Sequence, residues 1–215
     1  MNLVVVTHTH KDWKRDLTQV IASVKDALPS NSRHEIIEVE DGYNNFISAR
    51  HSSCNLGDIV VFVDDDDYIP KDSLHIVKQA IEHTGAGIAF TREATIHENG
   101  RQTINLPATM YDMIVLHPQA IHHMTAFNTK HIHDRSLELS MKHGSGIEWI
   151  MRADAAYSGG AVYIPVVGYY WVQHNEQHHK QLYSQQFFGV NMQPIRRELE
   201  MWQNRRGPIP SYKNR

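Results

Sequence analysis

One segment constrains this chain more than any other: an apolar run that ends in four consecutive aspartates. Residues 59–63 read Ile-Val-Val-Phe-Val, and residues 64–67 are all Asp. A run of β-branched and aromatic residues is typical of a strand that is buried on both faces, as in a parallel sheet covered by helices. Adjacent carboxylates repel one another and are costly to bury without a cation or hydrogen-bond donors. The segment therefore predicts a buried strand that ends in an acidic site.

The spacing of these acids indicates a ligand chemistry. In an extended chain the side chains alternate, so we expect Asp64 and Asp66 to point to one side and the other two aspartates to the opposite side. Paired carboxylate oxygens suit Mg²⁺ or Mn²⁺, which keep positions open for substrate phosphates. Ligands of open α/β sheets bind at the carboxyl ends of strands, where this cluster lies. The alternative is an acidic turn that caps the helix after Pro70.

Strand and helix patterns alternate in the first part of the chain. Apolar periodicity predicts strands at residues 3–6, 35–39 and 59–63, and helices at 13–28, 45–56 and 73–83. This order favours right-handed βαβ units and an α/β fold with a mostly parallel sheet flanked by helices. Short strands at 88–90, 94–96 and 102–106, the last after an Asn-Gly turn, then indicate a change to hairpins.

We therefore divide one domain of 215 residues into three parts. Residues 1–105 form the expected nucleotide-binding half, 106–180 a small mixed second half, and 181–215 a helix with a basic tail. Hydrophobic residues make up 41% of the chain, which is enough for a globular core. The later pattern includes a helix from residue 146, a strand at 161–167 continuing at 169–172, and a helix near 194–202.

The net charge and the cysteine content limit which binding partners and which cellular compartment suit this protein. The net charge of −3 gives no overall basic field for nucleic acid, although basic and aromatic residues gather near the end of the chain. These are Arg196, Arg197, Trp202, Arg205, Arg206, Tyr212, Lys213 and Arg215. They fit either a solvated helix with a loose terminus or a tail that meets phosphates, lipid headgroups or an acidic partner. A lone Cys54 excludes an intrachain disulfide and suits a reducing compartment.

No apolar run approaches the ~20 residues that a membrane-spanning helix requires. The apolar stretch at the N-terminus becomes polar at Thr7, too early for a signal peptide. We therefore expect a cytoplasmic protein without a membrane span.

Four segments, in this order, resemble the GT-A glycosyltransferases, and among them the inverting family 2. Residues 4–8 (Val-Val-Val-Thr-His) are similar to the family's first strand, which ends near the nucleotide. Residues 39–43 (Val-Glu-Asp-Gly-Tyr) resemble its V-D-D-G-S turn, with Glu in place of one Asp and Tyr in place of Ser. Residues 49–51 (Ala-Arg-His) resemble its A-R-N element, and residues 57–67 its G-[DE]-x-[IV]-x-F-L-D-x-D-D motif.

The resemblance implies that residues 1–105 bind a nucleotide sugar and that residues 106–180 form the acceptor and catalytic half. It also implies a set of donor-binding residues. The nucleotide contacts it implies are Thr7, His8, Glu40, Asp41, Arg50, Asp64 and Asp65. It implies metal ligation by Asp66 and Asp64, with the ion bridging to the donor's diphosphate. Residues 171–174 (Trp-Val-Gln-His) partly match a Y-R-x-H element, which implies that His174 binds the metal or the diphosphate, although the Arg of that element is missing.

Glu148 is the candidate general base. Residues 147–149 (Ile-Glu-Trp) resemble the family's E-D-W-like helix start, which carries that base. A base would deprotonate the acceptor hydroxyl, and Trp149 beside it would supply an apolar wall. The alternative is a carboxylate that interacts with the positive end of a helix dipole.

An acceptor cleft is a further hypothesis, because aromatic rings stack on sugars or bases and imidazoles donate hydrogen bonds to hydroxyls. Its candidate lining residues are Tyr111, His117, His122, His123, Phe127 and His131. Ordinary core and loop packing explains the same residues. The chain has 16 histidines, but their spacing fits no particular zinc geometry.

The sequence thus predicts a glycosyltransferase that uses Mn²⁺ or Mg²⁺ and a nucleotide sugar, with UDP as the carrier and inversion at the anomeric carbon. The acceptor is open between a glycan, a lipid-linked sugar, a protein and a modified nucleic acid base, and the basic tail mildly favours DNA. One alternative is a nucleotidyltransferase, although residues 7–11 lack the glycines of a phosphate loop. Another is a catalytically silent domain that binds a nucleotide or a glycan.

Overall fold

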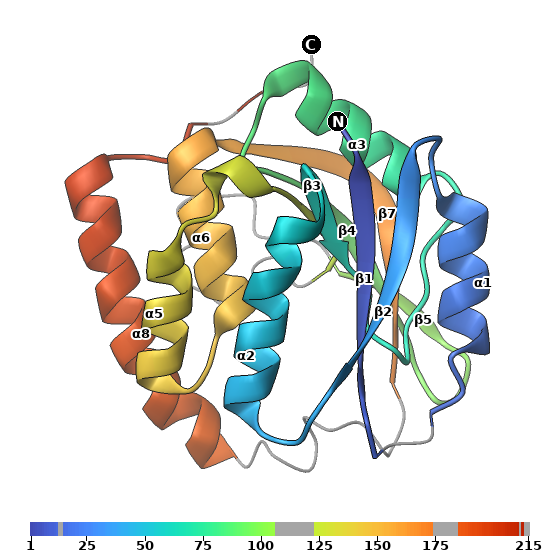
Figure 1. The fold of residues 1–215 in the computed structure, drawn as a ribbon, viewed down its shortest axis with the longest axis horizontal. Helices are drawn as coiled ribbons and strands as arrows, with labels where there is room; N and C mark the ends of the chain where they lie inside the picture. Colours follow the sequence, from blue (N-terminus) through green and yellow to red (C-terminus); the bar gives the residue numbers. More distant parts are fainter. Residues whose placement is uncertain (13–14, 106–122, 174–184, 211, 213–215) are drawn as a thin grey trace.

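The computed structural model describes residues 1–12, 15–105, 123–173, 185–210 and 212, with the helical backbone but not the side chains of 185–191. Within these ranges the chain forms three layers, a seven-stranded sheet between two groups of helices (Figure 1). None of the helices described is long and apolar enough to cross a membrane.

The first three strands form the parallel part of the sheet. β1 (Leu3–His10) lies between β2 (Ser32–Val39) and β3 (Ile59–Phe62) and is parallel to both. Helix α1 (Thr18–Ala27) connects β1 to β2 on one face of the sheet. Helix α2 (Tyr43–Ser52) and the 3₁₀ helix η1 (Ser53–Leu56) connect β2 to β3 on the other face. The expected βαβ order is confirmed here.

The other four strands make the sheet mixed. β6 (Thr125–Asn128) is antiparallel to both β3 and β4 (Ile88–Ile96) and lies between them. β5 (Gln102–Asn105) is antiparallel to the second half of β4, and β7 (Ala161–Val172) pairs in parallel with both halves. Because β7 takes one edge of β4, β5 and β6 share the other. Residues 88–90 and 94–96, which we expected as separate strands, are therefore two parts of one strand.

The helices cover both faces of the sheet. Side chains alternate along each strand, so consecutive residues pack against opposite faces. Leu3 and Val5 of β1 belong to the core under α1 and α3 (Ser73–Thr84). Val4 and Val6 belong to the opposite core, which the remaining α-helices cover (Figure 1). These helices are α2, α5 (Asp134–His143), α6 (Ile147–Gly159) and α8 (Gln185–Arg206), and a short 3₁₀ helix, η2 (Thr129–His131), precedes α5.

The acidic cluster is a turn and not the end of a strand. β3 ends at Phe62, and residues 64–67 close a turn in which the backbone N–H of Asp67 donates to the carbonyl of Asp64 at 3.2 Å. The expected strict alternation of the four carboxylates is therefore wrong, because alternation requires an extended chain. The turn sends these side chains in several directions, which brings them to different partners.

The backbone of helix α6 packs directly against the backbone just before β4, with no side chain between them. A Cβ built on Gly87 would lie 1.8 Å from the carbonyl oxygen of Ala155 and 3.3 Å from Cα of Gly159. A run of small residues on α6 includes Ala153, Ala155 and Ala156, each fully buried. This close contact fixes the position of α6 relative to the sheet.

We predict that Gly87→Ala destabilises the fold by at least about 3 kcal/mol, because the new methyl group overlaps backbone that cannot rotate away. Gly85→Ala is the matched control: nothing lies within 4 Å of its Cβ, and only its φ of +69° is unfavourable. The control should cost about 1 kcal/mol. Urea unfolding of both variants measures the difference, and equal losses would contradict the close packing of α6 on β4.

Candidate active site

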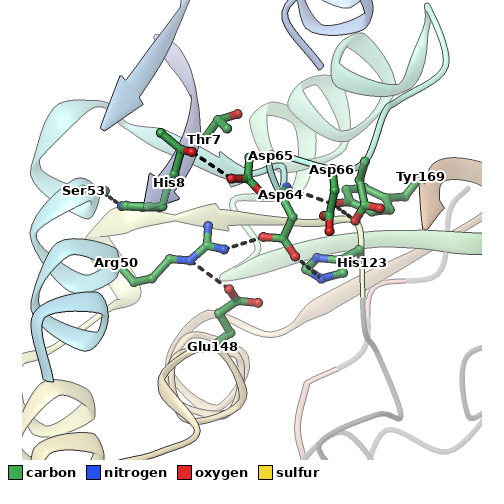
Figure 2. A network of polar contacts seen from close by, with 12 residues as sticks. Thr7, His8, Arg50, Ser53, Asp64, Asp65, Asp66, His123, Glu148 and Tyr169 are labelled. Atoms are coloured by element: carbon green, nitrogen blue, oxygen red, sulfur yellow. Dashed lines mark hydrogen bonds and ion pairs between the residues drawn. The ribbon is translucent and has the colours of Figure 1, made fainter. Parts of the chain in front are cut away.

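Polar and charged side chains converge where β1 and β3 end (Figure 2). The turn of Asp64, Asp65 and Asp66 supplies the acids, and groups from α2, α6, the β1–α1 loop and the residues before β6 surround it. Since β1 and β3 are parallel, their carboxyl ends open at the same edge of the sheet. This is the edge at which ligands of α/β sheets bind.

Asp64 is held between two cations. Its Oδ1 accepts a hydrogen bond of 2.6 Å from Nη2 of Arg50, and its Oδ2 lies 3.4 Å from Nε2 of His123. Burial favours the neutral acid, but His123 and Arg50 outweigh it and hold the pKa of Asp64 well below its ordinary value. Burial likewise favours neutral His123, yet Asp64 raises the pKa of that imidazole to about 9. Both groups are therefore ionised at neutral pH.

Glu148 meets the same network from the other side. It lies in the first turn of α6, and its side chain is 23% exposed. Its Oε1 is 3.0 Å from Nε of Arg50, so one guanidinium contacts both Glu148 and Asp64. One turn later on α6, buried Arg152 has its pKa lowered to about 10 by desolvation, partly offset by the negative charges of Glu148 and Glu93. Charged groups thus line this side of the site.

Trp149 does not stand beside the Glu148 carboxylate as an apolar wall. It is 2% exposed and belongs to the core that α6 forms with α2 and α5. Consecutive residues of a helix point about 100° apart, so the neighbour of an outward-facing Glu turns into the core.

Asp65 and Asp66 share a different cation. Nη1 of Arg15 donates to Oδ2 of Asp66 at 2.7 Å and lies 3.3 Å from Oδ1 of Asp65. Asp65 also accepts a hydrogen bond of 2.8 Å from the hydroxyl of Thr9. Burial raises the pKa of Asp65, although Arg15 acts in the opposite direction. Arg15 is therefore a common partner of Asp65 and Asp66.

Asp67 has a structural place. It is 1% exposed, its Oδ2 accepts from the hydroxyl of Tyr169 at 2.8 Å, and its Oδ1 accepts from the backbone N–H of Val172 at 2.8 Å. Burial and the nearby charges of Asp64 and Asp66 raise its pKa well above the ordinary value. The same Tyr169 hydroxyl accepts a hydrogen bond of 3.0 Å from the N–H of Asp64, and the ring stacks on His123 with centroids 4.6 Å apart. Tyr169 thus anchors the acidic turn to β7.

Thr7 and His8 are buried and bonded within the protein. The Thr7 hydroxyl pairs with Nε2 of His34 at 2.9 Å, and Nε2 of His8 pairs with the hydroxyl of Ser53 at 3.1 Å. Burial, and then the charge of Arg50, lowers the pKa of His8 to about 3. Both side chains thus have a partner inside the fold, while Nδ1 of His8 is buried without a hydrogen-bond partner among the described residues.

Glu40 and Asp41 lie on the turn after β2, at the same sheet edge as the acidic turn. Their side chains are 76% and 89% exposed, and they pair with Lys11 at 3.5 Å and with His10 at 3.4 Å. These exposed acids are free to turn toward a ligand, unlike Thr7 and His8.

The residues described contain no cluster of three His, Cys, Asp or Glu side chains arranged for a metal ion. His174, the third metal ligand that we expected, lies outside the described residues, as do Tyr111, His117 and His122 of the hypothetical acceptor cleft. Phe127 packs in the core against Phe62 with ring centroids 5.7 Å apart, and does not line a cleft.

Two residues of the network, Arg15 and Tyr169, escaped the sequence analysis, and His123 was named there only as a candidate lining residue of the acceptor cleft. Each comes from a segment distant from the acidic turn in sequence, and no motif marks it. A weak signal existed for Arg15, because it follows the first strand at the edge where the acids were expected. For His123 the histidine-rich surroundings hid its contact with Asp64.

The basic residues near the end of α8 lie away from this site. Arg206 contributes its charge near His133 and Arg135, at the start of α5. That end of α5 follows η2, whose Thr129 hydroxyl bonds to the carbonyl of Gly57, just before β3 begins. The last turn of α8 therefore lies at the opposite edge of the sheet from the carboxyl end of β1 (Figure 1).

No model of a known protein family matches this sequence, and no curated protein matches it. Solved structures of TarS from S. aureus, a GT-A glycosyltransferase, do match. TarS 1–349 with UDP-GlcNAc has a TM-score of 0.57 at 16% identity, covering 91% of this chain and 65% of that one. The same fragment with UDP has a TM-score of 0.62 at 15% identity, covering 91% and 64%.

A structure of TarS itself aligns with a TM-score of 0.58 at 15% identity, and the match covers 91% of this chain and 39% of that one. The chain therefore spans less than two thirds of the length of the structures that it matches. The likeness confirms the expected GT-A fold.

We predict that Tyr169→Phe destabilises the protein by about 2 to 3 kcal/mol, because it leaves the buried Asp67 carboxyl and the N–H of Asp64 without their shared partner. Tyr170→Phe is the matched control: Tyr170 stacks on Tyr68 with centroids 4.7 Å apart, and its hydroxyl makes no hydrogen bond to the residues described. Urea unfolding monitored by circular dichroism compares the two. A loss in Tyr169→Phe no larger than in the control would refute the anchoring role.

Proposed function

We propose that this protein transfers a sugar from a nucleoside-diphosphate sugar, with UDP as the carrier, to an acceptor hydroxyl with inversion at the anomeric carbon. The observation that carries the proposal is the ion-pair chain from Asp64 through Arg50 to Glu148, at the ligand-binding edge of a GT-A fold. It places a candidate donor-binding acid and a candidate base within reach of one guanidinium. The structures with the same fold hold UDP-GlcNAc and UDP, which supports a nucleotide-sugar donor.

The donor would lie along the edge formed by the ends of β1, β2 and β3. Glu40 and Asp41 are exposed there and suit hydrogen bonds to the ribose or base, because carboxylates accept from hydroxyl and imide donors. Asp64 and Asp65 follow β3, on the other side of β1 from Glu40 and Asp41, where the diphosphate would pass. The predicted nucleotide-binding half thus places its acids on one edge of the parallel strands.

The carboxylates fit a hard cation in their chemistry, since Mg²⁺ and Mn²⁺ are held by one or two carboxylates completed by substrate phosphates and water. Asp66 is the stronger candidate ligand, because its partner Arg15 comes from a loop. Asp64 is the weaker one, because both of its oxygens face the cations Arg50 and His123. A bound divalent ion would act as a Lewis acid that stabilises the leaving diphosphate.

Glu148 would accept the acceptor's proton. In a single displacement, the acceptor oxygen forms a bond to the anomeric carbon while the bond from that carbon to the diphosphate oxygen breaks. The hydroxyl proton passes to a carboxylate, and the electron pair of the broken bond leaves with the nucleoside diphosphate. Oε1 of Glu148 faces Arg50, and the proton would pass to Oε2.

The acceptor stays open between a glycan and a modified nucleic acid base. The described basic residues of α8 end at the far edge of the sheet, so they do not support a nucleic acid strand running from that helix to Glu148. Localisation to the cytoplasm is part of the same proposal.

We predict that UDP or a UDP-sugar with Mn²⁺ raises the melting temperature by roughly 5 to 10 °C at about 100 times the dissociation constant. Asp66→Asn keeps the side-chain volume but loses the charge, and should abolish the Mn²⁺-dependent part of the shift. The measurement is a thermal melt with each nucleotide, with and without Mn²⁺. An unchanged Mn²⁺ effect in Asp66→Asn would exclude Asp66 as a ligand.

Arg15→Gln is the informative counterpart. Arg15 competes with a divalent ion for the Asp66 carboxylate, so its removal should tighten Mn²⁺ binding, whereas Asp66→Asn should weaken it. Electron paramagnetic resonance of free Mn²⁺ reports both affinities without any turnover. Weaker Mn²⁺ binding in Arg15→Gln would show that Arg15 supports the cation site and does not compete with it.

We predict that Glu148→Gln lowers release of the nucleoside diphosphate from the donor by at least about 100-fold, while donor affinity changes by less than about threefold. Glu138→Gln, on the exposed face of α5, is the matched control and should leave turnover unchanged. Retained turnover in Glu148→Gln would remove its role as the base. Release of pyrophosphate instead of a nucleoside diphosphate would indicate the alternative nucleotidyl transfer, and donor binding without turnover would indicate a silent binding domain.

A further inference from the structure

Arg50 occupies an unusual position for a residue expected at a nucleotide. Its side chain is only 2% exposed, although it stands between two carboxylates of the candidate active site (Figure 2). Nη2 donates to Asp64 at 2.6 Å, and Nε lies 3.0 Å from Glu148. The guanidinium thus lies between the donor side of the site and its candidate base.

Two aromatic rings fix the guanidinium in this place. Its Cζ lies 4.8 Å from the ring centroid of Phe46, one turn earlier on α2, and 4.5 Å from that of Phe62, the last residue of β3. A cation near the face of an aromatic ring is attracted by the ring quadrupole, more strongly when water is excluded. Arg50 is therefore located by the core as well as by its ion pairs, and its position does not depend on a ligand.

The contact between Nε of Arg50 and Oε1 of Glu148 is an ion pair at 3.0 Å. It does not have the geometry of a hydrogen bond, and Nε has no hydrogen-bond acceptor among the described residues. A general base must be held in place while a lone pair stays available for the proton. An ion pair to one carboxylate oxygen satisfies both requirements, since it attracts the group without a directional bond. Arg50 meets them for Glu148.

Arginine is not deprotonated in proteins, so the guanidinium of Arg50 keeps its charge between Glu148 and Asp64. The cation is thus permanent, and both carboxylates are drawn to one fixed charge. Any displacement of Arg50 would change the separation of Glu148 from Asp64.

We propose that Arg50 is a positioning residue, which sets the place of Glu148 relative to Asp64 and does not contact the nucleotide. The inference rests on the proposed function and departs from what the family resemblance implies for Arg50. Under this inference, a residue of the core determines the distance between the candidate base Glu148 and the donor-side acid Asp64. A misplacement of about 1 Å in a catalytic group costs on the order of 100-fold in rate.

A double-mutant cycle tests this inference. It uses the full chain with Arg50→Gln, Glu148→Gln and the double variant, and measures UDP-GlcNAc affinity by calorimetry and UDP release at saturating UDP-GlcNAc. If Arg50 acts through Glu148, Arg50→Gln lowers turnover by about 100-fold in the wild-type background and by less than about threefold in the Glu148→Gln background. UDP-GlcNAc affinity then changes by less than about threefold in both backgrounds.

Two results would overturn the inference. A loss of UDP-GlcNAc affinity of about tenfold or more in both backgrounds, with turnover at saturation retained, would make Arg50 a nucleotide contact. Losses in turnover that multiply independently would mean that Arg50 does not act through Glu148. Failure of the proposed function is distinguishable, because the wild type itself would then neither bind UDP-GlcNAc nor release UDP.

Folding is the necessary control, since Arg50→Gln leaves two acids facing a buried amide. Melting temperatures of all variants are measured first. Where Arg50→Gln does not fold, Arg50→Lys replaces it in both arms of the cycle, because lysine keeps the charge but cannot offer a planar fork to two carboxylates. The expected pattern is the same, with a large loss of turnover only where Glu148 is present.

Discussion

The structure depends on the neutralisation of acids at the end of β3. Buried carboxylates are tolerated only when cations or hydrogen-bond donors compensate them, and here each compensating group comes from a different element. Arg15 reaches in from the loop after β1, Arg50 from α2, His123 from the residues before β6 and Tyr169 from β7. One acidic turn therefore joins both faces and both halves of the sheet. Removing a single partner leaves a charge or polar group buried, so electrostatics here holds the fold and the site together.

The sequence was most informative where local pattern determines structure. The apolar run before the aspartates became a fully buried strand, and the alternation of strands and helices became the parallel β2-β1-β3 unit. The resemblance to GT-A glycosyltransferases agrees with the fold seen in TarS. Glu148 lies at a helix start beside the acids, as its motif indicated, although its part in catalysis is still a prediction.

Other features could not be predicted, because they depend on partners distant in sequence or on where a strand stops. Strict alternation failed at the aspartates because β3 ends at Phe62 and the chain turns. The resemblance implied that Arg50 approaches a nucleotide, but no motif indicated that rings from α2 and β3 and two carboxylates surround its side chain. His123 gained its importance only from the packing that brings it to Asp64 and Tyr169.

The parallel pairing of β4 with β7 has a consequence for how the chain folds. These strands are far apart in sequence, so their pairing closes a long loop. Such contacts form slowly, because the chain loses the entropy of loop closure before the contacts between the strands stabilise it. Tyr169 belongs to β7 and holds the acidic turn. During synthesis, Arg15 and Arg50 are made before the aspartates that they contact, whereas Asp67 lacks its partners until β7 emerges and docks. The order of the chain thus makes the organised acidic site a late product of folding, completed after the strands that carry its acids.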